Sequence, residues 1–162
     1  MDSKSITSVE VVLQKLEYYC SYQERCHLEV QNKLRQFFIN SNEKDIIIVK
    51  LIENNFLNEE RFAELFSISK FHQKKWGKNR IKMELKIKKI SDYLISKAIK
   101  KIPQEEYYDT FQELSEQFWE TILEKKAIKK RKKFCDYLLR KGWESDWIYE
   151  KAKQLENNKL SK

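Results

Sequence analysis

The sequence predicts an all-α protein built from tandem helical units. Only two glycines and one proline occur in 162 residues, so few positions can break a helix or form a tight hairpin turn. An apolar residue followed four positions later by leucine recurs three times, at spacings of 51 and 53 residues. Residues i and i+4 share one side of a helix, and a repeat of this length is typical of small units that bury their apolar faces against neighbours. The three pairs are Val30/Leu34, Ile81/Leu85 and Phe134/Leu138.

The first unit is expected to contain three helices. Apolar periodicity predicts one helix from about Val9 to Gln23, with Ser8 as its N-cap. Two more helices are expected from about His27 to Ile39 and from about Glu43 to Asn54. The last helix should stop at Asn54-Asn55, because asparagine tolerates a positive φ.

The second unit opens at Asn58, a good N-cap that is followed by two glutamates in the first turn. Its first helix should end at Trp76-Gly77. Two shorter helices are expected from about Asn79 to Lys88 and from Ser91 to about Ile102, where a proline follows. The predicted core face of the first helix consists of Phe62, Leu65, Phe66, Ile68 and Phe71.

The third unit begins with a long acidic helix, from about Gln104 to Glu124, which is followed by a basic helix that ends at Lys141. Gly142 stands where a helix C-terminus favours glycine. Ser145 or Asp146 is then expected to cap a final helix that runs through Leu155, and Trp143 is expected to pack on its own helix. The predicted apolar side of the acidic helix consists of Tyr108, Phe111, Leu114, Phe118, Trp119 and Ile122.

These helices divide the chain into three repeats, at residues 1–57, 58–103 and 104–162. No low-complexity linker separates them, so we expect one continuous, elongated, modular body. The chain carries a formal net charge of +8, which is typical of proteins that meet a polyanion but also of proteins that are merely soluble. No apolar run approaches the roughly 20 residues that span a bilayer. The first 12 residues lack the pattern of a signal peptide, so a cytoplasmic protein without membrane contact is expected.

No catalytic constellation is recognisable. The two histidines are far apart, and no P-loop, HExxH or glycine-rich phosphate motif occurs. The three cysteines, Cys20, Cys26 and Cys135, lack metal-ligand spacing, and reduced, partly buried thiols are expected. The sequence therefore predicts a protein that is not an enzyme and that needs no cofactor or metal.

Two basic segments, in different units, are the candidate binding surfaces. Lysine and arginine greatly outnumber acids there, and such a bias releases counterions from phosphates on binding. The alternative is two solvated helix faces. The candidate residues for DNA or partner binding are Lys74, Lys75, Lys78, Arg80, Lys82, Lys86, Lys129, Lys130, Arg131, Lys132, Lys133, Arg140 and Lys141.

The acidic helix of the third unit lies next to these basic helices in sequence. Opposed charge stripes suit a protein that lies in the groove of a larger assembly, where different faces meet acidic and basic walls. Pairing of the acidic helix with basic helices of the same chain is the equal alternative.

Several motifs resemble the RecX family, regulators of the RecA recombinase. The resemblance covers about Val9 to Leu155, and its most specific part is the junction Arg61-Phe62-Ala63. Asn55 and Lys89 stand where the family has glycine, and Cys26 stands where it has serine. The matching stretches are Glu29-Val30 with Lys33-Leu34, Asn55 to Ala63, Gly77 to Ile81 with Glu84-Leu85, and Tyr137 to Trp143.

The resemblance implies three tandem three-helix repeats in a curved body. It also implies a protein that binds RecA and the RecA–single-stranded DNA filament and inhibits filament extension, ATP hydrolysis and strand exchange, with direct contact to single- or double-stranded DNA as a further possibility. We expect the protein to be a monomer. Two alternatives stay open. One is a general helix-turn-helix DNA-binding protein that does not act through RecA, and the other is a protein-interaction scaffold that binds no nucleic acid.

Overall fold

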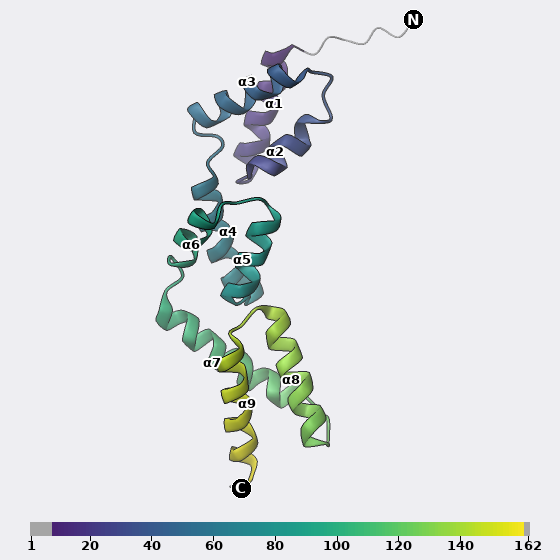
Figure 1. Ribbon diagram of the computed structural model, residues 1–162, viewed down its shortest axis with the longest axis vertical. Coiled ribbons are helices and arrows are strands. Elements are labelled where there is room, and N and C mark those ends of the chain that lie inside the picture. Colours follow the sequence, from purple (N-terminus) through teal and green to yellow (C-terminus); the bar gives the residue numbers. More distant parts are fainter. Residues whose placement is uncertain (1–7, 161–162) are drawn as a thin grey trace, which may run out of the picture.

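The computed structural model describes residues 8–160, with side chains described for residues 8–158. These residues form nine helices and no strand. The helices lie in three groups of three, stacked end to end into an elongated body with α1 and α9 towards opposite ends (Figure 1). The all-α prediction is confirmed. None of the described helices is long and apolar enough to cross a bilayer.

The first group consists of α1 (Val9–Tyr22), α2 (His27–Leu34) and α3 (Ser41–Glu53). The Ser8 hydroxyl caps α1 as predicted, since it accepts a hydrogen bond from the Val11 amide at 3.3 Å. The second helix ends five residues earlier than predicted, in successive turns, and α3 therefore starts two residues earlier. A separate hydrophobic core holds this group together, made of Val12, Leu16, Cys20, Val30, Leu34, Ile47, Leu51 and Leu57.

The second group consists of α4 (Glu59–Lys74), α5 (Lys78–Ile87) and α6 (Asp92–Ile99). Asn58 caps α4 as predicted, by accepting a hydrogen bond from the Arg61 amide at 2.9 Å. The predicted core face of α4 is only partly correct. Phe62 and Phe71 are buried, whereas Leu65 is half exposed because α4 packs mainly against α5 and α6 on its other side.

The third group consists of α7 (Gln104–Thr121), α8 (Ala127–Lys141) and α9 (Ser145–Leu160). Two predictions for this group are wrong. The last helix begins at Ser145 itself, and the Glu144 carbonyl accepts its first helical hydrogen bond, so neither Ser145 nor Asp146 precedes the helix. Tyr107 is buried and its neighbour Tyr108 is half exposed, the reverse of the predicted apolar side.

The repeated apolar pairs occupy equivalent places in the three groups. All six residues, Val30, Leu34, Ile81, Leu85, Phe134 and Leu138, are fully buried, so the predicted repeat is confirmed as a packing unit. The turn after the second helix of the later groups is also shared. Lys89 (φ 60°) and Gly142 (φ 89°) each lie four residues after the repeated leucine in the left-handed region.

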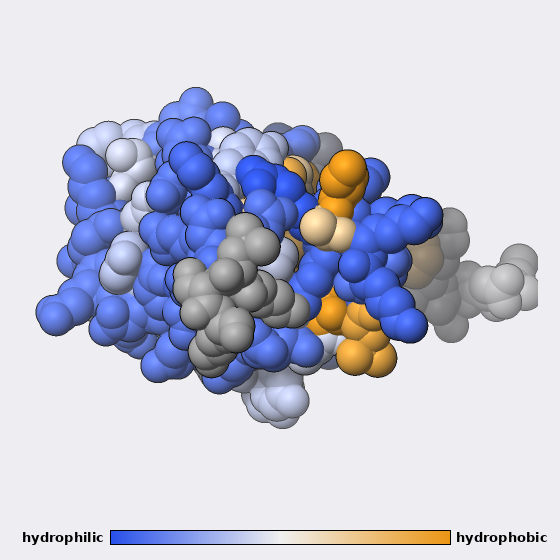
Figure 2. Space-filling view, turned by 90° about the horizontal axis from the view of Figure 1, so that it is seen from below, coloured by the Kyte–Doolittle hydropathy of each residue, from blue (hydrophilic) through white to orange (hydrophobic). Residues whose placement is uncertain are grey.

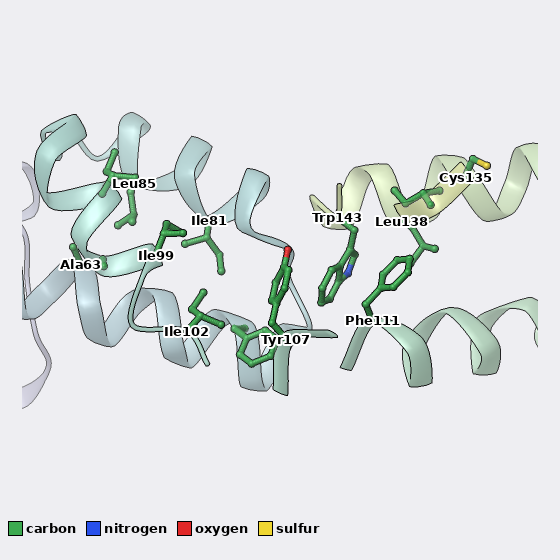
Figure 3. Packing of buried hydrophobic residues seen from close by; sticks show 14 of the residues in the cluster. Ala63, Ile81, Leu85, Ile99, Ile102, Tyr107, Phe111, Cys135, Leu138 and Trp143 are labelled. Carbon is green, nitrogen blue, oxygen red and sulfur yellow. The ribbon is translucent and has the colours of Figure 1, made fainter. Parts of the chain in front are cut away.

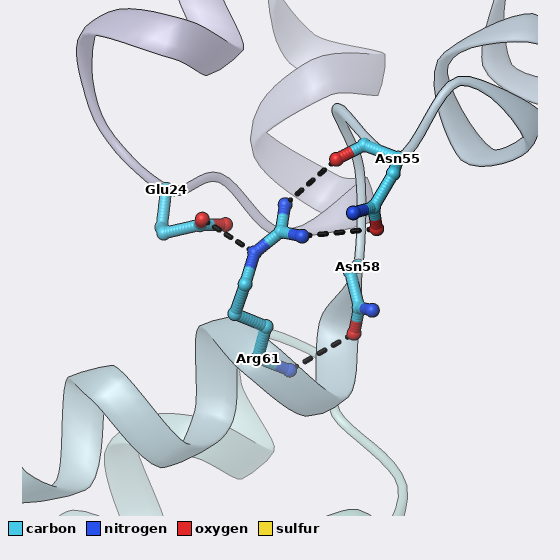
Figure 4. A network of polar contacts seen from close by, with 4 residues as sticks. All are labelled: Glu24, Asn55, Asn58 and Arg61. Carbon is cyan, nitrogen blue, oxygen red and sulfur yellow. Dashed lines mark hydrogen bonds and ion pairs between the residues drawn. The ribbon is translucent and has the colours of Figure 1, made fainter.

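The joint between the first and second groups is largely polar (Figure 4). The Arg61 guanidinium pairs with Glu24 and donates hydrogen bonds of 3.0 Å to the side chain and the carbonyl of Asn55. Asn55 reaches this position because it adopts the left-handed conformation predicted for it, with φ 60°. A second ion pair crosses the joint from Lys88 to Glu29 at 2.8 Å. Cys26 and Leu28 supply its main apolar contacts.

The second and third groups share one hydrophobic core (Figure 3). Ile81, Leu85 and Ile99 of the second group belong to the same buried cluster as Phe111 and Leu138 of the third. The two groups are therefore joined by apolar packing, in contrast to the polar joint above them. Because the second and third groups pack directly on each other, the basic residues of these two groups can lie side by side.

Candidate nucleic-acid and partner interface

Two glycines allow the second and third groups to meet backbone to backbone. The Gly77 amide donates a hydrogen bond to the Lys141 carbonyl at 2.8 Å, and the Asn79 amide donates one to the Gly142 carbonyl at 3.1 Å. A Cβ atom on Gly77 would lie 2.2 Å from the Gly142 carbonyl oxygen. The start of α5 is thereby fixed directly against the end of α8.

Tyr107 and Trp143 close this junction from the side, with ring centroids 4.6 Å apart (Figure 3). The Tyr107 hydroxyl accepts a hydrogen bond from the Lys78 amide at 2.9 Å and donates one to the Glu144 carboxylate at 2.8 Å. The Trp143 indole N–H donates to the Lys75 carbonyl at 3.2 Å. The prediction that Trp143 packs on its own helix is therefore incomplete, because its polar edge anchors the second group.

The junction brings the two basic segments together. The Arg80 guanidinium donates to the Arg140 carbonyl at 3.1 Å, and the Lys141 ammonium donates to the Lys74 carbonyl at 2.7 Å. Burial, followed by the nearby charges of Arg80 and Lys74, lowers the pKa of Lys141. Three like charges from two segments that lie at least 60 residues apart in sequence thus form one basic cluster, Lys74, Arg80 and Lys141, and Arg140 contributes its backbone carbonyl to it.

Two candidates also have structural roles beside this cluster. The Lys78 ammonium lies 4.3 Å from the centroid of the Tyr107 ring and donates to Gln104. Its pKa is lowered by burial and by the charge of Lys82, although Glu144 opposes the shift. The Arg80 guanidinium lies 4.2 Å from the centroid of the Trp76 ring, so its planar face is covered by an aromatic side chain.

Around the cluster, several candidates extend into solvent. Lys74, Lys75 and Lys82 are exposed and make no side-chain ion pair within the described residues, while Lys86 pairs with Asp92 at 3.4 Å. On α8, Lys129 is exposed and likewise makes no side-chain ion pair with a described residue. Arg131 pairs with Glu156 at 2.8 Å, and Lys132 pairs with Asp136 at 2.7 Å. The Lys133 ammonium contacts Glu124 at 3.5 Å.

Lys130 does not belong to the exposed face with which it was grouped. It is only 7% exposed, and its ammonium lies 4.6 Å from the centroid of the Trp119 ring. The reason is helical periodicity, since Lys130 precedes the buried Phe134 by four residues and Leu138 by eight. The basic segment of α8 therefore contributes one lysine to the interior and the rest to the surface.

The acidic helix α7 is partly neutralised within the chain. Glu106 contacts His72 at 2.8 Å, and Glu116 contacts Lys151 at 2.6 Å, so α7 pairs with α4 and α9. This agrees with the intramolecular alternative for these two acids. No group of three histidine, cysteine or acidic residues within the described part could hold a metal ion. All three cysteines are free and buried, and burial raises the pKa of Cys20 to about 11.

The sequence reasoning missed the turn between α7 and α8. Leu123 and Ile128 are among the most exposed large hydrophobic side chains of the described residues, and Lys125 and Lys126 lie between them. The sequence feature that indicates this turn is a pair of apolar residues, Leu123 and Ile128, in a polar break between two helices. The expected acidic helix runs to Glu124 and so includes Leu123, whereas α7 ends at Thr121.

Comparison with known proteins agrees with this geometry. A family model described as "RecX, second three-helix domain" matches residues 58–99, which include α4, α5 and α6. The crystal structure of RecX from Lactobacillus salivarius superimposes with a TM-score of 0.78 and 26% identity, and the match covers 91% of this chain and 96% of that one. The chain is thus similar to RecX proteins in fold and in sequence.

Other RecX proteins extend the comparison. A second crystal structure, of a regulatory protein RecX, has the same fold with a TM-score of 0.79 at 19% identity, over 90% of this chain and 71% of that one. The regulatory proteins RecX of Bacillus thuringiensis and Bacillus cytotoxicus are 25% and 26% identical over 141 residues, or 87% of this chain. The chain spans about half the length of these relatives, 52% in each case. Each of these relatives is named a regulatory protein.

Proposed function

We propose that this protein regulates a RecA-type recombinase. In this proposal it binds RecA and the RecA–single-stranded DNA filament and inhibits filament extension, ATP hydrolysis and strand exchange. Its basic surface contacts DNA directly. Similarity to RecX proteins supports the choice of partner. The elongated body supports binding along a polymer, because successive weak contacts on one chain add through effective concentration.

One observation carries the nucleic-acid part of the proposal. The junction between α5 and α8 holds Lys74, Arg80 and Lys141 together, and burial, followed by the charges of Arg80 and Lys74, lowers the pKa of Lys141. Like charges held together in this way raise the local potential and attract anions. Exposed lysines add positive charge next to α4, on α5 and on α8, namely Lys75, Lys82 and Lys129, and such charges are available to phosphate groups.

The proposal has three further parts that follow the sequence predictions. The repeats are bounded at residues 57 and 103, within the turns that precede α4 and α7. The protein acts as a monomer towards the filament. It works in the cytoplasm, where such filaments form on DNA.

The test is the ATPase rate of preformed recombinase–single-stranded DNA filaments as the protein is titrated in. We expect the rate to fall at amounts well below the recombinase concentration. The double variant Lys82→Glu/Lys129→Glu should need several-fold more protein for the same inhibition, because both side chains are exposed and unpaired. Lys100→Glu, an exposed lysine at the end of α6, is the matched control and should inhibit like the wild type.

A different outcome would favour the plain DNA-binding alternative. If the ATPase rate falls only when the DNA itself is saturated by this protein, the regulation proposal is wrong and general DNA binding explains the effect. If Lys82→Glu/Lys129→Glu inhibits as strongly as the wild type, the basic surface is not the point of contact.

A further inference from the structure

The turn between α7 and α8 exposes two large aliphatic side chains at the end of the molecule farthest from the first group. Leu123 is 91% exposed and Ile128 is 85% exposed, more than any other large hydrophobic residue among those described. Figure 2 views this end of the molecule and shows hydrophobic side chains among hydrophilic ones. Isolated exposed leucines are common, but two on one turn need a reason.

An open cavity of about 610 Å³ is lined by Ile128, while Leu123, five residues earlier on the same turn, lines a second open cavity of about 470 Å³. Trp119, Ala127 and Ile128 contribute apolar surface to the larger cavity, and Glu156 and Asn157 of α9 line another side. A concave site with an apolar lining and a few polar groups suits the insertion of a side chain better than contact with a flat surface. Its volume is sufficient for one large apolar residue of a partner.

The two carboxylates that line the cavity are already paired, Glu156 with Arg131 at 2.8 Å and Glu124 with Lys133 at 3.5 Å, so the unpaired charges beside it are positive. Lys125, Lys126 and Lys129 are exposed, and none of them forms a side-chain ion pair with any described residue. In contrast, Arg131, Lys132 and Lys133 on the same helix each have a carboxylate partner. The three unpaired ammonium groups therefore mark the side from which an acidic partner would approach.

We propose that this surface, formed by Leu123, Lys125, Lys126, Ile128 and Lys129, binds an acidic segment of a partner protein. A large apolar side chain of the segment fills the cavity against Trp119 and Ile128, and its carboxylates meet the three lysines. The exposed residues are aliphatic, so they offer no aromatic face for stacking on nucleic-acid bases. The surface shares Lys129 with the positive surface proposed for DNA but none of the residues of the basic cluster at the α5–α8 junction, and it would bind a protein while that cluster binds a phosphate backbone.

The test uses the full chain and a fluorescein-labelled 15-residue peptide, rich in aspartate and glutamate with a central Leu-Phe pair. Fluorescence anisotropy at low salt should show binding to the wild type. Leu123→Ser/Ile128→Ser should weaken it at least tenfold, and Lys125→Glu/Lys126→Glu/Lys129→Glu should abolish it. All five positions are exposed, so these variants should keep the wild-type circular dichroism and unfolding temperature.

Matched controls separate this surface from general charge and general apolar exposure. Lys100→Glu and Leu65→Ser alter an exposed lysine and a half-exposed leucine of the second group, and both should bind the peptide like the wild type. A peptide with serine in place of the Leu-Phe pair should bind at least tenfold more weakly.

Three results would overturn the proposal. One is peptide binding that is unchanged in both sets of variants. Another is equal binding of the serine peptide. The last is that the variants lose binding to oligo(dT) or to vesicles of phosphatidylcholine and phosphatidylserine but still bind the peptide. That result would make nucleic acid or lipid the occupant. Neither recombinase nor a filament is present in this assay, so its outcome is independent of the ATPase test.

Discussion

Gly77 and Gly142 face each other across the junction between the second and third groups at backbone contact. The Cβ that an alanine would add to Gly142 lies 2.3 Å from the backbone nitrogen of Arg80, and the one added to Gly77 lies 2.3 Å from the carbonyl carbon of Gly142. Neither clash is with the flexible end of a side chain. The arrangement of the second and third groups depends on this contact, because it places the basic residues of α5 beside those of α8.

Gly77→Ala should therefore separate the two groups or strain them. Overpacking of this kind costs roughly 1–3 kcal/mol of unfolding free energy. Chemical denaturation of the full chain measures the loss. Asn79→Ala is the control two residues away, since its side chain is exposed and only its backbone amide bonds across the junction; we expect a change within about 0.5 kcal/mol. Equal stability of Gly77→Ala and wild type would contradict the close approach.

Tyr107→Phe should destabilise the protein although it removes a single oxygen atom. The Lys78 amide and the Glu144 carboxylate would each lose a partner at a half-buried site, which costs roughly 1–3 kcal/mol. Tyr108→Phe changes the adjacent residue in the same way, but its ring is half exposed and the change should be within about 0.5 kcal/mol. Thermal unfolding of the two variants side by side distinguishes them, and equal effects would argue against the Tyr107 hydrogen bonds.

The joint between the first and second groups should weaken in acid. Burial raises the pKa of Glu29, but hydrogen bonds from Lys88 and the Cys26 amide, together with the Lys88 charge, outweigh it and hold the pKa below its ordinary value of 4.5. A carboxylate with a lowered folded-state pKa stabilises the protein fully above pH 4.5, and this contribution disappears as the pH falls through the lower folded value.

Glu29→Gln provides the comparison for this pH effect. It should unfold at a lower temperature than the wild type at pH 7, and the difference should shrink as the pH falls below about 4.5, where the unfolded-state carboxyl takes up a proton. Thermal unfolding between pH 7 and pH 3 measures the difference. A gap that stays constant over this range would show that the charge of Glu29 does not hold the joint.

Exposed and buried lysines of the basic segments should differ in their effect on DNA binding. Lys82→Ala and Lys129→Ala should each lower the slope of log affinity against log salt concentration by ~1 and leave the unfolding temperature unchanged. Lys130→Ala should leave this slope unchanged and lower the unfolding temperature, because its side chain is buried against Trp119 and serves the packing of α8. Binding of oligo(dT) at several salt concentrations provides the measurement, and a reduced slope for Lys130→Ala would overturn this assignment.

Local patterns in the sequence were sufficient for the fold class. Scarce breakers and the repeated pairs led to helices in tandem units, and Ser8 and Asn58 cap the helices that their residue types favour. These features depend on neighbours within one or two turns, so periodicity and propensity report them directly. The motifs that resemble the RecX family are local as well, and the family model and the solved structures to which the chain is similar carry the same name.

Only the tertiary structure decided which residues meet. Tyr107 rather than Tyr108 is buried because the Lys78 amide and Glu144 lie where its hydroxyl can bond them. Lys130 lies inside because α8 presents that side to Trp119, although its neighbours in sequence are all basic. The basic cluster arises because two glycines let backbones from different units touch, and the exposed pair Leu123 and Ile128 arises because nothing in the described chain covers that turn. Contacts between residues far apart in sequence depend on the angle at which helices pack, and no single segment of the sequence encodes that angle.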